Sequence, residues 1–330
     1  MSSGLIPAWK QIAGDILLGK RGLVKSNEIW LPLCLMMADQ AGQSIFTALA
    51  IFLATACWSL ACIWVNDLVD KGADLAAGKN RWIQQLSPDS GRVILAALIL
   101  GNACLIAAFS RPITLIIYLG AVLLGFFYSL RPFRYKERGA WGPVVYSLSC
   151  MLGFVMLPWA WLRGDIYLLV LLAPAVFLDK WVQLHFHQVI DYQKDVQTHT
   201  QTFTVVMGLD KSKSILRIMT SLASLLLLSV LVFTIFEKAE IPWLFALFFI
   251  LVGIGLVIHS HSARKNRRST RLQRELPFHY LALTFLSFRL APILLLVQII
   301  TAEYKMIPLG IFATLLIFIE SLQSMHYQYE

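Results

Sequence analysis

Two groups of acidic side chains at helical spacing suggest the chemistry of this protein. The first group lies in the segment NDLVDKGAD and comprises Asn66, Asp67, Asp70 and Asp74. If the segment is helical, residues four positions apart share one face. Carboxylates placed this closely repel one another, so we expect a cation beside them.

The second group lies in the segment HFHQVIDYQKD, residues 185–195. His187, Asp191 and Asp195 again follow one another at intervals of four and share a helix face. Carboxylates with open coordination positions suit Mg²⁺, which keeps several waters and binds substrate phosphates. Basic side chains of nearby loops could contact the same phosphate oxygens. The two groups therefore predict a site for Mg²⁺ and a phosphorylated substrate, if the fold brings them together.

The elements that carry both groups are predicted to cross a membrane. Of the 330 residues, 58% are hydrophobic and only 14% are charged, and the mean hydropathy is +0.69. A soluble protein of this length needs a more polar surface, so the composition favours the integral membrane class. The segment SIFTALAIFLATACWSLACIWV, which ends just before Asn66, has no charged residue. The first acidic group therefore ends a predicted membrane span.

Ten apolar runs are candidate spans, because about 20 mainly apolar residues are needed to cross the hydrocarbon. They fall near residues 28–43, 45–69, 91–109, 111–130, 140–162, 166–190, 213–236, 241–260, 278–300 and 306–324. We predict an all-α bundle of nine or ten spans that forms one membrane domain, residues 28–330. Residues 1–27 are predicted to form a cytoplasmic segment with an amphipathic helix on the membrane surface.

Basic residues gather in alternate connections between the predicted spans. The N-terminal segment and the loops after the second, fourth, sixth and eighth spans hold most of the cations, and the eighth is followed by ARKNRRSTRLQRE. The positive-inside rule places these loops and both termini in the cytoplasm. This asymmetry, together with anionic lipid headgroups, accounts for the net charge of +9 without a nucleic-acid partner.

The order of these motifs resembles the UbiA-type intramembrane prenyltransferase superfamily. NDLVDKGAD resembles its NDxxDxxxD signature, DYQKD resembles its second DxxxD motif, and TQTFTVVMG resembles the threonine-to-glycine stretch that follows. AGKNR and FFYSLRPFRYKERG are similar to the family's segments after the first motif and after the fourth span. The resemblance covers about residues 20–210.

The resemblance implies a transmembrane helical bundle around a central cavity open to the membrane, with Mg²⁺ as cofactor. In such proteins the two motifs hold Mg²⁺ on a prenyl diphosphate, the diphosphate leaves, and an acceptor captures the allylic cation. The chain is therefore expected to be a prenyltransferase of isoprenoid biosynthesis. Its expected partners are a prenyl diphosphate, a small aromatic or quinone-precursor acceptor and membrane lipids, with no obligate protein partner. A multi-pass location in a bacterial inner membrane is expected.

The resemblance assigns roles to individual positions of this sequence. Metal binding is implied for Asn66, Asp67, Asp70, Asp74, Asp191 and Asp195. Contacts with the diphosphate are expected from Arg81, Lys136, Arg138 and Lys194. The candidate catalytic residues are Asp70, Asp191 and His187, the last either as a base toward the acceptor or as a packed neighbour of Asp191. Two further candidates are Tyr128, at the cavity mouth or packed at the interface, and Lys180, which contacts substrate or extends toward the interface.

Several positions depart from the family pattern and leave the acceptor open. Leu75 stands where many relatives have arginine, and Trp82 stands where they have proline. One alternative is a terpene cyclase or synthase of the same superfamily, which ionises the prenyl diphosphate without an acceptor. Another is a transporter or lipid-binding protein, although acidic groups at one membrane face and the lack of a convincing internal repeat disfavour it.

Overall fold

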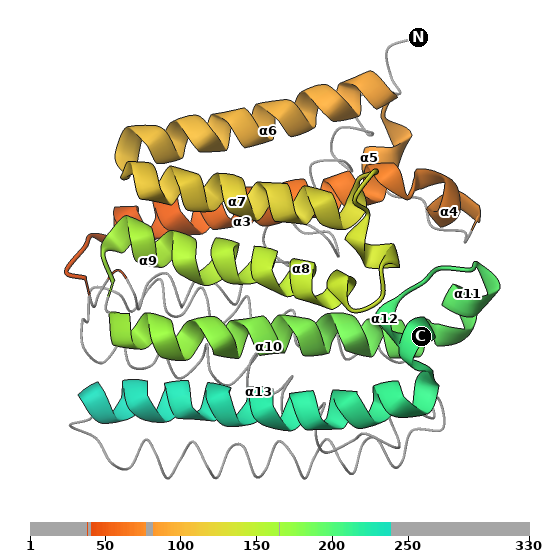
Figure 1. The fold of residues 1–330 in the computed structure, drawn as a ribbon. Coiled ribbons are helices and arrows are strands. Elements are labelled where there is room, and N and C mark those ends of the chain that lie inside the picture. Colours follow the sequence, from red (N-terminus) through yellow and green to blue (C-terminus); the bar gives the residue numbers. More distant parts are fainter. Residues whose placement is uncertain (1–37, 39–40, 77–81, 165, 239–330) are drawn as a thin grey trace, which may run out of the picture.

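The computed structural model describes residues 38, 41–76, 82–164 and 166–238, and the named elements in this part of the chain are all helices (Figure 1). The long elements are α3 (Ile45–Val69), α6 (Pro88–Phe109), α7 (Pro112–Ser129), α8 (Trp141–Met151), α10 (Ile166–Ile190) and α13 (Leu209–Lys238). The short elements are α4 (Lys71–Ala76), α5 (Trp82–Gln85), η1 (Tyr135–Glu137), the π-helix η2 (Leu152–Met156), α9 (Leu157–Leu162), α11 (Tyr192–Gln197) and α12 (Phe203–Met207).

Five stretches of helix are long and apolar enough to cross a membrane. They are Phe46–Val69, Pro88–Phe109, Pro112–Ser129, Trp141–Leu162 and Leu169–Ile190. These coincide with the second to sixth predicted spans, and α13 makes the predicted seventh span helical. The all-α membrane class is therefore confirmed. The predicted amphipathic helix, most of the first span and the last three spans lie outside the described residues.

Local sequence signals fix where several helices begin. Ser44 caps α3, because its Oγ accepts a hydrogen bond from the backbone N–H of Thr47 at 3.3 Å. Ser87 caps α6 in the same way, because its Oγ accepts a hydrogen bond from the backbone N–H of Ser90 at 3.1 Å. Proline follows at the first position of α6 and of α7, where its fixed φ suits a helix and its missing N–H costs nothing.

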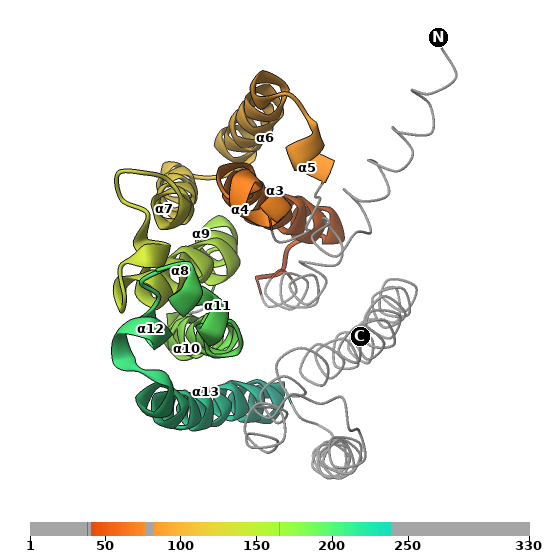
Figure 2. The same cartoon turned by 90° about the vertical axis from the view of Figure 1, so that its right-hand side faces the viewer.

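The long helices follow one another along an arc (Figure 2). Helix α3 packs against α6 and α7, α7 packs against α8, α8 packs against α10, and α10 packs against α13. The short elements α4, α5, α11 and α12 all lie at one end of the long helices (Figure 1). This arrangement brings the ends of α3 and α10, which carry the acidic groups, to the same end of the bundle.

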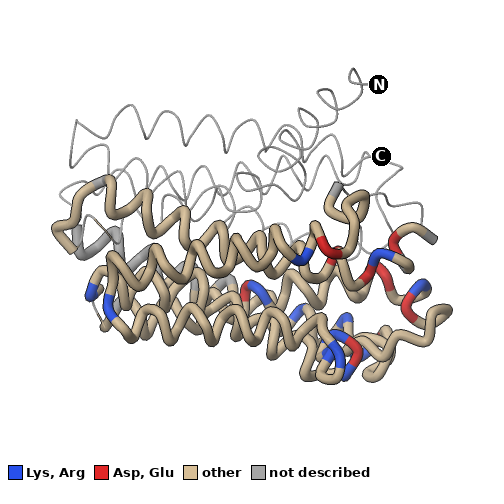
Figure 3. Tube along the Cα trace, turned by 90° about the horizontal axis from the view of Figure 1, so that it is seen from above, with Lys and Arg blue, Asp and Glu red and all other residues tan. Residues whose placement is uncertain are grey.

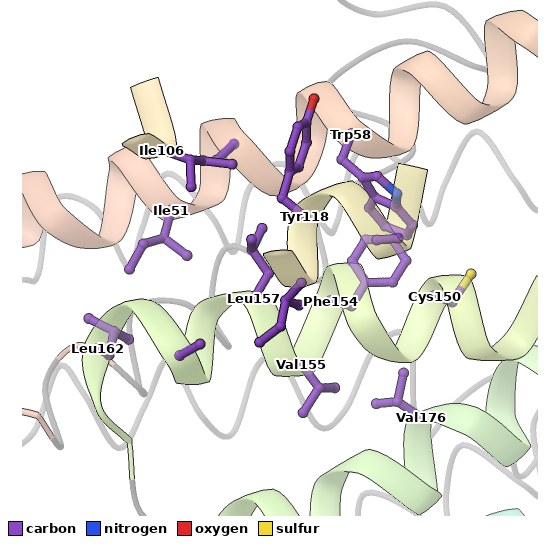
Figure 4. Close-up of a cluster of buried hydrophobic side chains, with 14 of the residues drawn as sticks. Ile51, Trp58, Ile106, Tyr118, Cys150, Phe154, Val155, Leu157, Leu162 and Val176 are labelled. Carbon is purple, nitrogen blue, oxygen red and sulfur yellow. The ribbon is translucent and has the colours of Figure 1, made fainter. Parts of the chain in front are cut away.

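A buried apolar cluster joins α3, α7, the α8–η2–α9 segment and α10 (Figure 4). Trp58 packs edge-on against Phe154 with 4.9 Å between the ring centroids. Gly153 permits this contact, since a Cβ atom there would lie 2.4 Å from the Trp58 ring. Large apolar side chains on α6 and α7, such as Val93 and Ile116, are exposed instead, as expected for surfaces that face lipid.

Candidate active site

The first acidic group lies where α3 passes into α4. The Asp70 N–H donates to the Asn66 carbonyl at 3.0 Å, and the Asp74 N–H donates to the Asp70 carbonyl at 2.8 Å. The helical spacing therefore continues through Asp70, although Asp70 itself is the C-cap of α3. Asp67 differs from its neighbours, because it is only 2% exposed.

A lysine of the loop after α7 contacts this group directly. Lys136 Nζ lies 2.6 and 2.5 Å from the two carboxylate oxygens of Asp70 and 3.1 Å from Asn66 Oδ1. Asn66 Oδ1 also accepts a hydrogen bond from Ser129 Oγ at 3.1 Å. Burial lowers the pKa of Lys136, while the hydrogen bond and charge of Asp70 act in the opposite direction. Three oxygens of the first group thus bind a cation.

Arg134 is a second cation beside Asp70. Its guanidinium lies 3.5 Å from Asp70 Oδ1 and forms an ion pair with Glu137 at 2.6 Å. The backbone φ of Arg134 is +39°, a conformation that costs free energy for a residue other than glycine and often occurs at functional sites. The sequence placed Arg134 in a basic loop, but its contact with Asp70 was missed.

Gln84 supports the first group through hydrogen bonds to Asp67 and Asp74, which Lys136 and Arg134 are not seen to contact. Its Nε2 donates to Asp74 Oδ2 at 2.9 Å and to the Asp67 carbonyl at 2.8 Å. Gln84 is 2% exposed, and its hydrogen bond to Asp67 is buried while that to Asp74 is partly buried, so the two together fix the geometry. Sequence reasoning missed this residue, because a glutamine in a four-residue helix carries no signal of the contact.

The second acidic group lies at the end of α10. The Asp191 N–H donates to the His187 carbonyl and the Asp195 N–H donates to the Asp191 carbonyl, both at 2.9 Å. Asp195 Oδ2 accepts a hydrogen bond from Thr202 Oγ1 at 3.1 Å. Burial raises the pKa of Asp195, and the Asp191 charge adds to this, while Thr202 and Lys194 oppose it.

The loop after α7 links the two acidic groups. Beyond Lys136, the Gly139 N–H donates to the Gln201 carbonyl at 2.9 Å, and Gly139 pairs with Thr202 in a parallel bridge. Gly139 has φ +53°, which glycine adopts without strain. The acidic groups therefore converge at one end of the bundle, where most of the described acidic residues gather (Figure 3).

The other predicted site residues lie in different surroundings. Lys194 and His187 are exposed, and the His187 ring packs edge-on to Phe186 with 6.2 Å between centroids. Arg138 is exposed and lies over the Tyr135 ring, so it contacts neither acidic group in this structure. Arg81 lies outside the described residues.

Tyr128 and Lys180 lie on the membrane side of the acidic groups. Tyr128 is half-buried and packs against Tyr146 with 5.6 Å between the ring centroids. Lys180 is 5% exposed, in the interior of α10. The aromatic pair therefore joins α7 to α8, whereas Lys180 is buried in the bundle.

The oxygen donors of this site suit Mg²⁺. Among the described residues no three His, Cys, Asp or Glu side chains form a closed metal cluster. Mg²⁺ commonly binds through one or two carboxylates, waters and substrate phosphates rather than in a closed protein cage. The Asn66 and Asp70 oxygens that contact the Lys136 ammonium are the hard donors that this ion prefers.

Comparisons with known proteins agree with this fold. The sequence profile of the UbiA prenyltransferase family matches residues 28–288, whereas no curated protein sequence matches the chain. A UbiA homologue from Archaeoglobus fulgidus bound to GPP and Mg²⁺ is similar in structure, with TM-score 0.55, 18% identity, and coverage of 83% of this chain and 98% of that chain. A structure described as digeranylgeranylglyceryl phosphate synthase in membranes has TM-score 0.57, 17% identity, and coverage of 84% and 95%. The chain belongs to the UbiA prenyltransferase family.

Proposed function

We propose that this protein is a Mg²⁺-dependent intramembrane prenyltransferase that ionises a prenyl diphosphate and transfers the prenyl group to an acceptor. The loop after α7 carries the proposal, because it contacts the first acidic group and the segment that supports the second. Lys136 binds Asp70, and Gly139 pairs with the segment whose Thr202 holds Asp195. The archaeal homologue solved with DMAPP and Mg²⁺ supports the same substrate class.

The residues of the site divide into metal ligands and phosphate contacts. The metal would be held by Asn66, Asp67, Asp70 and Asp74 from the first group and by Asp191 and Asp195 from the second. When bound, Mg²⁺ neutralises diphosphate charge and so makes the diphosphate a better leaving group. Lys136 and Arg134 would move from Asp70 to phosphate oxygens; Lys194, Arg138 and Arg81 would approach from the loops.

The aromatic pair beneath the acidic groups would protect the reactive cation. Cleavage of the allylic C–O bond leaves its electron pair on the diphosphate and produces a carbocation, which must be kept from water. The faces of Tyr128 and Tyr146 exclude water and favour positive charge. An electron-rich aromatic or quinone-precursor acceptor then forms a bond to the cation and releases a proton, which His187 beside Asp191 could accept.

The same aromatic surfaces suit a second outcome. In a terpene cyclase or synthase, a double bond of the prenyl chain attacks the cation and no acceptor takes part. Tyr128 in α7 and Tyr146 in α8 are half-buried and pack against each other, and such rings stabilise migrating positive charge. Acceptor dependence distinguishes this outcome from prenyl transfer.

The test uses the whole protein purified in detergent with Mg²⁺ and labelled prenyl diphosphates, alone and then with candidate aromatic acceptors. Mg²⁺-dependent release of diphosphate with prenylated acceptor supports the transferase. A terpene formed without acceptor supports the cyclase. Full activity in EDTA contradicts metal dependence, and the absence of diphosphate release from every prenyl diphosphate contradicts both proposals.

We also propose a bacterial inner-membrane location with the acidic groups facing the cytoplasm, because cations concentrate in the loops on that side. After replacement of the five native cysteines, new cysteines would be labelled from outside intact cells. A cysteine at Arg163, between two spans, should react, and one at Lys136 should not. The reverse pattern overturns this orientation.

A further inference from the structure

The loop between α7 and α8 joins the candidate active site to an exposed surface. Its Lys136 ammonium contacts the Asp70 carboxylate. Other side chains of the same segment are exposed: Arg131, Phe133 at 38% and, at the start of α8, Trp141 at 61%. The loop lies on the outer edge of the arc of helices (Figure 2). One short segment therefore has a side chain in the site and a surface outside the bundle.

This exposed surface lies where two membrane spans end. The Pro112–Ser129 span ends two residues before Arg131, and the next span begins at Trp141. Aromatic rings at span ends usually lie at the level of the lipid headgroups, and cations there extend toward the headgroups. Exposed apolar side chains of α7, among them Leu119 and Leu123, lead along the helix toward the loop. A lipid acyl chain thus has an apolar surface to contact below the cation.

Four aromatic rings form a continuous row across the loop. The Phe127 ring at the end of α7 lies 4.2 Å from the Phe133 ring, between centroids. Phe133 stacks on Tyr135 at 6.1 Å with an interplanar angle of 22°, and Tyr135 lies 6.4 Å from Trp141. Contacts between rings favour defined geometries. The exposed rings of Phe133 and Trp141 are therefore already held in position.

The positive charge beside these rings is not neutralised by the protein. Among the residues that the structure describes, neither Arg131 nor Arg138 pairs with a carboxylate. Glu137, the acidic residue of this loop, pairs with Arg134 at 2.6 Å. The Arg138 guanidinium lies over the Tyr135 ring, 5.5 Å from its centroid. A guanidinium without a carboxylate partner suits a phosphate group, which it can bind through two parallel hydrogen bonds.

We propose that Arg131, Phe133 and Trp141 form a binding site for an anionic phospholipid, with Arg131 on the lipid phosphate and the rings beside the upper acyl chains. A bilayer lipid fits this site because the cation and the rings lie between two span ends. Bound lipid restrains the loop from outside, and the loop in turn holds Lys136 beside Asp70. The inference goes beyond the proposed function and does not depend on it.

The first test measures lipid binding by the whole protein in detergent. Native mass spectrometry counts the phosphatidylglycerol and phosphatidylcholine molecules that the protein retains from an equal mixture. The ratio of phosphatidylglycerol to phosphatidylcholine should fall about fivefold in Arg131→Gln, the usual contribution of one cation near an anionic membrane surface. Arg131→Lys keeps the charge and should keep most of the preference. Trp141→Ala should lower the retention of both lipids, since the ring contacts acyl chains in either case.

Arg92→Gln is the matched control for loss of charge. Arg92 is also exposed, lies at the start of α6 on the same end of the bundle (Figure 1), and pairs with Asp89 at 3.3 Å. Because a carboxylate already neutralises it, its removal should leave the ratio of the two lipids within about twofold of wild type.

The second test measures hydrogen exchange of the backbone amides in residues 131–141. The wild-type protein is compared in nanodiscs of phosphatidylcholine alone and of phosphatidylcholine with phosphatidylglycerol. Exchange should slow when phosphatidylglycerol is present, because a restrained loop opens less often. Arg131→Gln should show no such change, whereas Arg92→Gln should behave as the wild type.

The outcomes decide the proposal without an activity measurement. Equal retention of the two lipids by the wild-type protein, together with exchange that ignores phosphatidylglycerol, overturns it. An equal fall of the lipid ratio in Arg92→Gln and Arg131→Gln, with both variants eluting as the wild type on size exclusion, shows only general attraction of charge and overturns it too. Displacement of phosphatidylglycerol by millimolar inorganic phosphate would assign Arg131 to a free anion, and a second copy of the chain in place of lipid would assign the surface to a dimer. Either result contradicts a phospholipid site and leaves the prenyltransferase proposal intact.

Discussion

The two acidic groups differ in how firmly the protein holds them. In the first group, Asp70 contacts Lys136 and Arg134, and Asp74 accepts a hydrogen bond from Gln84. In the second group, Asp195 has its Thr202 hydrogen bond, whereas Asp191 and Lys194 are exposed. The first group is therefore fixed by partners from two other segments, and the second is fixed at one carboxylate.

This difference suggests a division of labour during substrate binding. Carboxylates that are already oriented need little reorganisation when a metal ion and diphosphate bind. The exposed carboxylate of Asp191, at the N-cap of the short helix α11, can instead adjust to the diphosphate once it is in place. We expect the first group to determine the affinity for the metal, and the second group to complete the site around the substrate.

The largest effects should follow removal of one central carboxylate from each group. Asp70→Ala and Asp191→Ala should each reduce kcat/KM for diphosphate release by about a thousandfold or more, because a ligand of a doubly charged ion cannot be replaced from lipid. If both groups hold one diphosphate, the double variant should lose little more than the worse single variant. The rates are measured on variants that remain folded in membranes. A double variant whose loss of kcat/KM equals the product of the two single losses would show that the groups serve separate sites.

The two lysines near the groups provide the next comparison. Lys136 contacts Asp70 and Asn66, whereas Lys194 is exposed. Lys136→Met should raise KM for the prenyl diphosphate by about 10- to 100-fold, the usual contribution of a charged hydrogen bond, with a smaller change in kcat. Lys194→Met is the matched control and should change KM by no more than about threefold. Equal effects of the two changes would contradict a special role for Lys136.

The sequence was sufficient for features that depend on local pattern. Apolar length predicts the spans that α3 to α10 form, and the spacing of Asp70 and Asp191 with their neighbours is retained through helical hydrogen bonds. The chain also places the Lys180 charge within a predicted span. These features follow from helical periodicity and hydrophobicity, which adjacent residues encode.

Contacts between distant segments could not be read from the sequence. Gln84 reaches Asp74 because α5 folds back on the end of α3, and Arg134 reaches Asp70 because its backbone adopts a positive φ. Thr202 belongs to a stretch that the family resemblance singled out, but its hydrogen bond to Asp195 depends on the path of the chain after α11. Each of these contacts is a tertiary result for which no local signal exists.

The uncharged partners of the two groups test whether the support of the two groups differs as much as the contacts indicate. Gln84→Leu should raise the Mg²⁺ concentration for half-maximal diphosphate release by about tenfold, because partners of metal ligands orient them. Thr202→Val should raise it by only about threefold, since Asp195 loses one neutral hydrogen bond. Mg²⁺ titrations at saturating prenyl diphosphate measure both values. A larger effect at Thr202 than at Gln84 would reverse the assignment of the firmly held group.

The smallest effect on ionisation should come from His187. It lies on the Asp191 face of α10, but it is exposed and its ring packs beside Phe186. His187→Ala should leave Mg²⁺-dependent diphosphate release within about twofold of wild type, because the interactions of an exposed side chain usually contribute less than about 1 kcal/mol. If His187 accepts the acceptor's proton, the yield of prenylated acceptor per diphosphate released should fall, since the cation then reacts with water or forms other products.

Diphosphate release and the yield of prenylated acceptor are measured in one assay with a labelled prenyl chain. The control variant His187→Gln, which keeps a polar side chain without a base of suitable pKa, should behave as His187→Ala. A parallel loss of release and coupling would place His187 in the ionisation site beside Asp191, and an unchanged yield would remove it from the reaction.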